Sequence, residues 1–427
     1  MRSSLGASLA EGVAAEVVGA CGGTTALLAW ALQLGCSGAT LALLASLPYA
    51  AQALQLPGAF LTARHGGRRV ALWTLFACRL CLVPLALLPL WPLDAGRARL
   101  LLCACAVGFH GTGILCSNAW TAWMGDLVPP RLRGRYFGRR TAVVTLANAA
   151  ATLAVGLTLD RTPAGAARGR CLAALAALGV LAGLVSQLWM SRQMEGRAHS
   201  QARPQPAAGA DGSVFRRLVF FQVAWNAALG LAAPLCYVYL AQSLRLPFTL
   251  IALYGAATSV ARGAVSSAWG RAVDRLGQRA ILGACAAGLA ASPLLFLAAR
   301  PGRLWPLGLE ALLAGGLGSG LSVAAFTLPL RLAGREERPF LCGRVAAGGG
   351  LAYACAALLG SSWWVHPAAP LAFADPLRLA LAVSATARLA TGIAAVRLLP
   401  AAPGRRAPLL RETARGFLRL LPDALRL

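Results

Sequence analysis

Long apolar runs separated by short polar segments fill most of this sequence of 427 residues. Each run holds about 20 residues, which as an α-helix is enough to cross the roughly 30 Å of hydrocarbon in a bilayer. The runs are rich in Ala, Leu and Gly and lack the alternation of apolar and polar residues that marks barrel strands. The pattern predicts twelve spanning helices, near residues 9–32, 39–63, 68–92, 98–124, 138–160, 168–190, 215–243, 248–270, 278–299, 303–331, 342–364 and 376–399.

A polar stretch divides these predicted helices into two sets of six. We therefore expect an all-α integral membrane protein with 12 transmembrane helices. In its tail, apolar residues and Arg form separate rows at helical spacing, which fits an interfacial helix on anionic headgroups. A basic tail without regular structure is the alternative. The expected parts are an N-terminal half at 1–190, a cytoplasmic linker at 191–214, a C-terminal half at 215–399 and the basic tail at 400–427.

Composition excludes a soluble protein of this size, because 58% of the residues are hydrophobic, only 13% are charged and the mean hydropathy is +0.64. A net charge of +26 would ordinarily suggest nucleic-acid binding. Here the positive residues stand mainly in short gaps between apolar runs, so orientation in a membrane explains them better. With both termini in the cytoplasm, most Arg residues fall on the cytoplasmic side. We expect a bacterial cytoplasmic (inner) membrane protein with no nucleic-acid partner.

The sequence offers little for enzymatic chemistry. Its 12 Cys lie mostly inside apolar runs without paired spacing, which argues against a disulfide framework or a zinc site. A phosphate-binding loop with its Lys is missing, because the chain contains no Lys at all. We therefore expect no cofactor, no bound metal and no ATPase activity.

A short basic turn occurs twice, in related form, after an apolar run. The second copy runs from Gly270 through Asp274 to Arg279, and the first runs from Ala59 to Arg68. Each matched pair is separated by the same number of positions. This repeat indicates two related halves. The matched pairs are Arg64 with Arg275, Gly66 with Gly277, and Arg68 with Arg279.

A second repeated segment follows the fourth predicted helix. It contains Asp126, Arg133, Gly134 and Gly138, and its partner in the second half begins at Arg338. Two six-helix halves, a central polar loop and the Gly-x-x-x-Asp-Arg-x-Gly-x-Arg turn resemble the major facilitator superfamily over residues 9–399. The resemblance implies a monomer with two pseudo-symmetric halves that rock around a midplane site.

The resemblance gives Asp274 a bridge to a neighbouring helix that helps to lock one access state. A topology anchor without a gating role is the alternative. In the first half, Ala63 stands where the signature has Asp, and Ala59 where it has the leading Gly. This departure puts the gating role of the first-half turn in question.

Ionisable residues inside predicted helices are candidates for function, because a charge in hydrocarbon is costly. Glu16, His110, Arg262 and Glu310 are such residues. The resemblance places helices one, four, seven and ten around a central cavity, with helix eight nearby. In that arrangement Glu16, His110 and Glu310 would carry protons or contact substrate. Alternatively Glu16 or Glu310 lies near an interface, or His110 is a hydrogen-bonded packing residue.

Arg262 calls for a buried carboxylate partner or an anionic substrate, because it stands near mid-helix. Structural pairing is the expectation for Arg79 and Arg388, on helices that the resemblance places outside the cavity. Pro234 in the seventh helix either permits bending during transport or simply kinks the helix. The glycines from Gly348 to Gly350 predict close helix packing.

Polar and aromatic residues on the expected cavity helices complete the candidate site. Asn118 and Trp120 lie on the fourth helix, and Asn226 lies on the seventh. Such groups supply stacking faces and hydrogen bonds to a bound solute. Aromatic residues near helix ends are, in the alternative interpretation, anchors at the membrane interface.

These observations favour a secondary transporter of a small organic solute, coupled to an ion gradient and by default to protons. Facilitated diffusion without coupling is the alternative. An aromatic, weakly charged cavity would suit an amphipathic molecule and export from the cell. Two other functions stay open. The first is a membrane sensor or scaffold that retains the fold without transport. The second is an integral membrane enzyme, for which the sequence shows no cluster of His, Asp and Glu.

Overall fold

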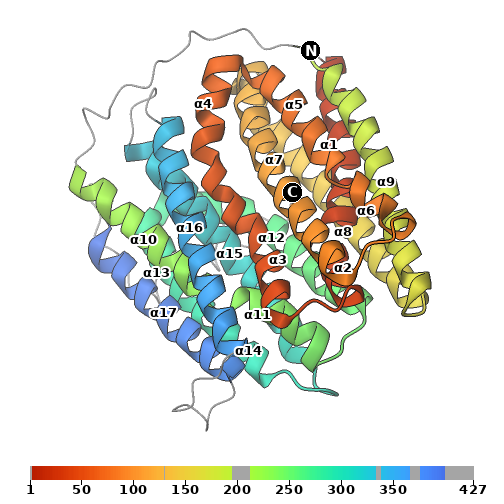
Figure 1. Cartoon of the computed structure of the whole chain (residues 1–427). Helices are drawn as coiled ribbons and strands as arrows, with labels where there is room; N and C mark the ends of the chain where they lie inside the picture. Colours follow the sequence, from red (N-terminus) through yellow and green to blue (C-terminus); the bar gives the residue numbers. More distant parts are fainter. Residues whose placement is uncertain (1, 129, 195–211, 333–337, 366–375, 400–427) are drawn as a thin grey trace. The chain divides into compact units, whose positions relative to one another are not determined.

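The computed structural model of the protein describes residues 2–128, 130–194, 212–332, 338–365 and 376–399 (Figure 1). Helices make up nearly all of this part of the chain, and its β structure is a single isolated bridge between Arg300 and Arg303. Eleven helical segments of the described chain are long and apolar enough to cross a membrane. The remaining predicted span, 342–364, coincides with helix α16. The all-helical prediction is confirmed.

Nine helices cover the first six predicted spans. The first three spans are each divided in two, and the 3₁₀ turn η1 (Ala51–Leu54) makes the division in the second. A further 3₁₀ turn, η2 (Leu88–Leu90), ends the third span. The helices are α1 (Arg2–Gly22), α2 (Thr24–Gln33), α3 (Gly38–Ala50), α4 (Gln55–His65), α5 (Gly67–Leu80), α6 (Val83–Leu87), α7 (Ala95–Leu127), α8 (Pro130–Arg161) and α9 (Ala166–Ser191).

The second half repeats this arrangement, with its first and third spans again divided. A π-helical turn, η3 (Tyr239–Ser243), ends the first span, and the 3₁₀ turn η4 (Leu289–Ala291) divides the third. The helices are α10 (Gly212–Gly230), α11 (Ala233–Val238), α12 (Phe248–Leu276), α13 (Gln278–Gly288), α14 (Ser292–Ala298), α15 (Trp305–Leu332), α16 (Arg338–Val365) and α17 (Pro376–Leu398).

The first span of each half is interrupted partway along its length. In the first half the break falls at Gly23, where an added Cβ would clash with the carbonyl oxygen of Gly19. In the second half the break precedes Pro234, which lacks an N–H group and cannot continue the hydrogen-bond ladder. The interruption predicted at this proline is therefore present. Breaks at corresponding places in two halves are also a feature of transporter binding sites.

The two basic turns have the same backbone conformation. Gly66 has φ 84° and ψ 142°, and Gly277 has φ 86° and ψ 154°. Each glycine N–H donates to the carbonyl oxygen four residues earlier, that of Thr62 or Val273, at 2.9 Å. This region of φ and ψ is essentially restricted to glycine. The repeat found in the sequence is thus a repeat in three dimensions.

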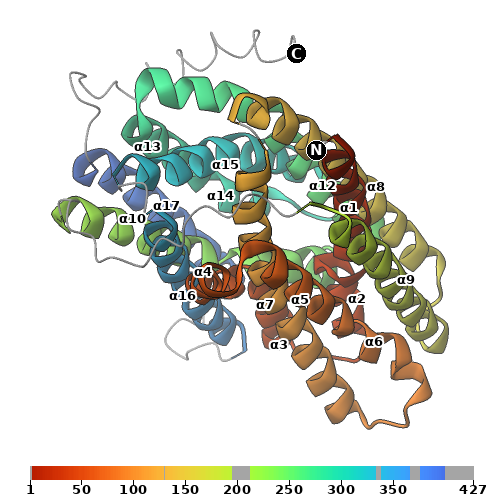
Figure 2. The same cartoon turned by 90° about the horizontal axis from the view of Figure 1, so that it is seen from above.

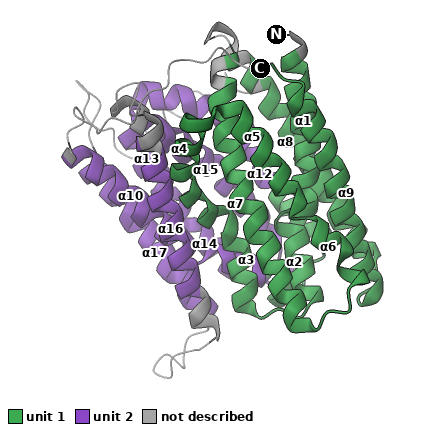
Figure 3. Cartoon of the chain, turned by 45° about the horizontal axis from the view of Figure 1, so that its top comes forward, with its two compact units in different colours: residues 1–203, 240–256 green, residues 204–239, 257–427 purple. Residues whose placement is uncertain are grey.

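Contacts between helices group the chain into two compact units (Figure 3). Unit 1 comprises residues 1–203 and 240–256, and unit 2 comprises residues 204–239 and 257–427. Within unit 1, α1 packs against α8 and α9, as Figures 1 and 2 show. Within unit 2, α10 packs against α16 and α17. The domain boundaries expected from the sequence stay a prediction.

Asp160, at the end of α8, ties the start of α12 to unit 1. Its carboxylate accepts the backbone N–H groups of Phe248 and Thr249, each at 2.8 Å, and the hydroxyl of Thr249 at 2.6 Å. The Arg168 guanidinium lies over the Phe248 ring, 5.7 Å from its centroid. A carboxylate at a helix N-terminus is favourable because it pairs with free N–H groups and the positive end of the dipole. Helix α12 therefore begins in unit 1 and continues into unit 2.

Glycines bring helices of unit 2 into close contact, as the run from Gly348 to Gly350 predicts. An added Cβ at Gly349 would lie 2.7 Å from the Asn226 side-chain nitrogen on α10. An added Cβ at Gly320 on α15 would lie 2.6 Å from the Trp269 ring on α12, whose N–H donates to the Gly316 carbonyl at 2.7 Å. Small residues are what permit such close packing between membrane helices.

We expect Gly277→Ala to lower the free energy of unfolding by about 1 to 3 kcal/mol, because alanine is strained at this φ and ψ. The control is Gly255→Ala in α12, where φ is not positive and an added Cβ meets nothing within 4 Å. The control should be neutral or slightly stabilising, since alanine favours helix. Thermal unfolding in detergent measures both, and equal melting temperatures for the two variants would contradict this account.

Candidate substrate and coupling site

A buried ion pair joins α1 to α8 inside unit 1. The Arg140 Nη2 lies 3.1 Å from the Glu11 Oε2, and the two side chains are 17% and 5% exposed. Ser186 on α9 donates its hydroxyl to the other carboxylate oxygen of Glu11 at 3.4 Å. Glu11 thus has partners on two helices, as a charge held within a membrane span requires.

The Arg140 guanidinium is held by three kinds of group. Besides the Glu11 carboxylate, its Nε donates to the Ser8 carbonyl at 3.3 Å, and its carbon lies 4.1 Å from the centroid of the Trp120 ring. An added Cβ at Gly12 would lie 2.9 Å from the guanidinium, so the absence of a side chain there makes room for it. Helices α1, α7 and α8 therefore converge on one positive charge.

A second polar contact joins the same two helices. Asn148 Nδ2 donates to Glu16 Oε2 at 2.8 Å. Between the two contacts, an added Cβ at Gly12 would lie 2.8 Å from Val144, so the helices touch closely there. Glu11 and Glu16 both face α8 and form, with its side chains, a polar row inside unit 1. Of the predicted candidates, the structure brings Glu16 and Trp120 to this row.

The other two candidates on α7, Asn118 and His110, lie apart from this row. Asn118 Nδ2 donates to the Gln55 carbonyl at 3.0 Å, which ties α7 to the start of α4. The ring of His110 lies edge-on to Phe109 at 5.3 Å, and its Nε2 is buried without a hydrogen-bond partner among the described residues. Roles for these two residues in binding or proton transfer stay predictions.

In unit 2 the buried polar residues lie on several helices. Glu310, 2% exposed, accepts a hydrogen bond from the Ser292 hydroxyl at 2.7 Å and lies in the second turn of α15, near the helix start. Arg388, 4% exposed, donates to the Leu289 carbonyl at 3.3 Å. Asn226 donates to the Gln222 carbonyl of its own helix at 2.8 Å. The substrate roles predicted for Glu310 and Asn226 stay predictions.

Two mid-helix arginines differ in their surroundings. Arg79 is buried against α9, where an added Cβ at Gly183 would lie 2.7 Å from its side chain. Arg262 is exposed and takes part in none of the ion pairs formed among the described residues. The carboxylate partner suggested as one alternative for Arg262 is therefore not found in the described part of the chain.

The first-half turn has a clear structural contact. Arg68 donates to the carbonyls of Ser191 at 2.9 Å and Gln193 at 3.3 Å, and Trp123 donates to that of Met194 at 3.1 Å. These donors satisfy carbonyl groups at the end of α9, which lack partners within the helix. Arg68 thereby fastens α9 to the basic turn.

The remaining signature residues stay candidates for gating. Arg64, Asp274 and Arg275 are exposed, Gly270 and Arg279 are half-buried, and Gly277 is buried. The structure does not describe the side chains of the signature residues after the fourth helix, which are Asp126, Arg133, Gly134 and Gly138. Residues 195–211 of the predicted linker and the tail from 400 to 427 also lie outside the described residues.

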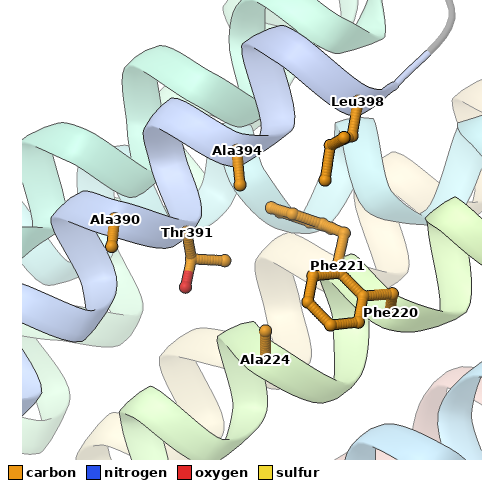
Figure 4. A pocket seen from close by; sticks show the side chains of 7 residues that line it. All are labelled: Phe220, Phe221, Ala224, Ala390, Thr391, Ala394 and Leu398. Carbon is orange, nitrogen blue, oxygen red and sulfur yellow. The ribbon is translucent and has the colours of Figure 1, made fainter.

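An apolar recess of about 170 Å³ lies between α10 and α17 (Figure 4). Its lining contains no charged residue. The one hydroxyl there, that of Thr391, already donates to the Ala387 carbonyl at 2.7 Å. None of the predicted site residues lines it. The lining residues are Phe220, Phe221, Ala224, Ala390, Thr391, Ala394 and Leu398.

Sequence reasoning missed the Glu11–Arg140 pair. Glu11 stands in the same apolar run as Glu16, which was a usable signal. Arg140 stands near the start of the predicted span 138–160, where an Arg commonly serves orientation in the membrane. The contact of Arg140 with Trp120 joins two different helices, and periodicity within one helix cannot predict such a contact.

We expect Arg140→Met to destabilise the protein by about 3 to 5 kcal/mol, because it leaves the Glu11 carboxylate buried without its cation. Adding Glu11→Gln should recover most of the loss, since a neutral amide is cheaper to bury than a charge. Thermal unfolding in detergent of the two single variants and the double variant measures this coupling. Losses that simply add would show that the pair is not a unit.

No protein-family model and no curated protein sequence matches this chain. Solved transporter structures are similar to it, among them a bacterial homologue of the iron transporter ferroportin in an inward-facing state, with a TM-score of 0.65 and 15% identity over 93% of this chain and 99% of that one. The nucleoside transporter NupG has a TM-score of 0.67 and 12% identity over 93% of this chain and 99% of its own. The inward-open xylose transporter XylE from E. coli has a TM-score of 0.66 and 14% identity over 97% of this chain and 98% of its own. At such identities the likeness concerns the fold. The chain is a multi-pass membrane protein with the fold of the major facilitator superfamily.

Proposed function

We propose that this protein is a secondary transporter that moves a small organic solute by alternating access and couples the movement to protons. It is not an enzyme in this proposal. The fold supports transport, and the breaks at Gly23 and before Pro234 support a midplane solute site. The observation that carries proton coupling is the buried pair of Glu11 and Arg140.

Protonation of Glu11 would change the forces between α1 and α8. An ion pair inside a membrane is tolerable while both charges are present, but one charge alone is costly. A proton on Glu11 leaves Arg140 with the Ser8 carbonyl and the Trp120 ring. A conformation in which the Arg140 guanidinium contacts water or an anion then becomes lower in free energy than the starting one. Proton binding therefore favours one conformation over the other, which is what coupling requires.

The interrupted helices supply the second part of the mechanism. At Gly23 and ahead of Pro234 one helix ends and the next begins, and helix ends are where backbone N–H and C=O groups lack partners within the helix. Such groups bind polar solutes in transporters, where irregular backbone at membrane depth lines a cavity. Both breaks lie in the first helix of a half, so rocking of the halves would change access to them.

The remaining parts of the proposal follow from charge and resemblance. Both termini lie in the cytoplasm of a bacterial cell and the protein sits in its cytoplasmic membrane, because this arrangement puts most Arg residues inside. The protein acts as a monomer. Asp274 contributes to gating at the cytoplasmic end of α12, and the first-half turn, with Ala63 in place of Asp, contributes through Arg68 alone.

The test is proton movement in liposomes that contain the purified protein and an internal pH-sensitive dye. Wild type should move protons with at least one member of a broad panel of labelled organic solutes. Glu11→Gln should abolish the solute-driven proton signal and keep exchange of labelled solute, because the solute site is intact. The control is Asp94→Asn, an exposed residue whose contact with the Arg97 backbone an amide can replace.

Other results would overturn parts of the proposal. Solute uptake by wild type without proton movement would exclude proton coupling. Loss of the proton signal in Glu16→Gln or Glu310→Gln, with Glu11→Gln unaffected, would assign the proton to another carboxylate. Silence of well-folded protein across the panel would favour a sensor or scaffold.

A further inference from the structure

Helix α12 exposes two faces of opposite character. Leu253, Val260 and Ala264 are exposed on one side and are apolar, with Ser267 as the exposed polar residue next to them. A separate face carries small or polar residues at helical spacing, of which Arg262, Gly263 and Ser266 are exposed and the others half-buried. We call this the polar face of α12; it comprises Ser259, Arg262, Gly263, Ser266 and Gly270.

Arg262 stands at the worst position for a charge facing lipid. It is the central residue of α12, equally far from Phe248 and Leu276 along the helix. Its guanidinium stays protonated in proteins, so it cannot escape the cost of burial by becoming neutral. None of the ion pairs among the described residues neutralises it. Within the described part of the chain, no carboxylate compensates this charge, and water or a bound anion can do so.

The neighbouring helix leaves room for this side chain. An added Cβ at Gly315 on α15 would lie 2.8 Å from the Ala261 Cβ, so the two helices are in close contact. One turn further along α15, an added Cβ at Gly318 would lie 3.5 Å from the Arg262 Nη2. On α12 itself, added Cβ atoms at Gly263 and Gly270 would meet nothing within 4 Å. The polar face is open to a small molecule.

We propose that the polar face of α12 is a water-filled solute-binding surface that selects small organic anions. Arg262 would bind two oxygens of a carboxylate, sulfonate or phosphonate, for which its planar fork of N–H groups is suited. The hydroxyl of Ser266, one turn away, is placed to donate a further hydrogen bond. The inference rests on the proposed transport function and specifies its solute class.

The test compares two membrane-impermeant thiol reagents of similar size and opposite charge, the ethylsulfonate and ethyltrimethylammonium methanethiosulfonates. Ser266→Cys is placed in the full chain and labelled in lipid nanodiscs, which leave both membrane surfaces open to the reagents. Mass spectrometry of the peptide around residue 266 separates this label from the native cysteines. The control is Ala264→Cys on the apolar face at nearly the same depth.

We expect Ser266→Cys to react with both reagents, the anionic one being favoured, and Ala264→Cys to react far more slowly. Adding Arg262→Gln should reduce the anionic-to-cationic rate ratio about fivefold, the effect of a unit charge one helical turn away in a hydrated site. Arg262→Lys should keep the ratio, which separates charge from misfolding.

Three outcomes would overturn the inference. These are an unreactive Ser266→Cys, equal reaction of both faces, or a rate ratio that Arg262→Gln leaves unchanged. Labelling needs no solute flux, so its result is independent of the transport assay. Charge-selective labelling without flux would refute transport and keep the anion surface, whereas flux without charge selectivity would refute the anion surface alone.

Discussion

Hydrocarbon offers no hydrogen-bond partner, and this constraint governs every polar group in the protein. Several polar side chains inside the spans have partners from other helices: Trp269 donates to the Gly316 carbonyl, and Ser384 to the Ala228 carbonyl at 2.6 Å. Charges follow the same rule more strictly. Glu11 and Arg140 neutralise each other within unit 1. Where a charge has no such partner among the described residues, as at Arg262, the same rule calls for water or an anion.

The same constraint accounts for the breaks in the helices. A break leaves backbone groups unpaired, so it is tolerated at membrane depth only where protein or water satisfies them. The breaks at Gly23 and before Pro234 occupy corresponding places in the two halves. Gly66 and Gly277 likewise share one backbone conformation that only glycine adopts readily. Duplication of one half thus explains both the shared turns and the shared interruptions.

The sequence predicted what depends on local patterns. Runs of apolar residues gave the spans to within a few residues, and Pro234 and the matched glycines gave the break and the turns. It did not predict pairs between distant helices, because nothing in the spacing of Glu11 and Arg140 shows that α1 will lie against α8. An Arg at the edge of an apolar run, as Arg140 is, serves orientation more often than pairing. The hydrogen bond from Asn118 to the Gln55 carbonyl could not be predicted either, and the cavity role expected for Asn118 stays a prediction.

The central claim is that Glu11 takes up a proton in competition with Arg140. Infrared difference spectroscopy of the membrane-embedded protein between high and low pH tests it directly, because a protonated carboxyl group has its own C=O stretching band. We predict that acidification of the wild type produces a carboxyl band and a change in the guanidinium band beyond those of the other carboxyl groups, and that this additional pair of signals is absent in Glu11→Gln. A carboxyl band of unchanged intensity in Glu11→Gln would show that another residue takes the proton and would contradict the account.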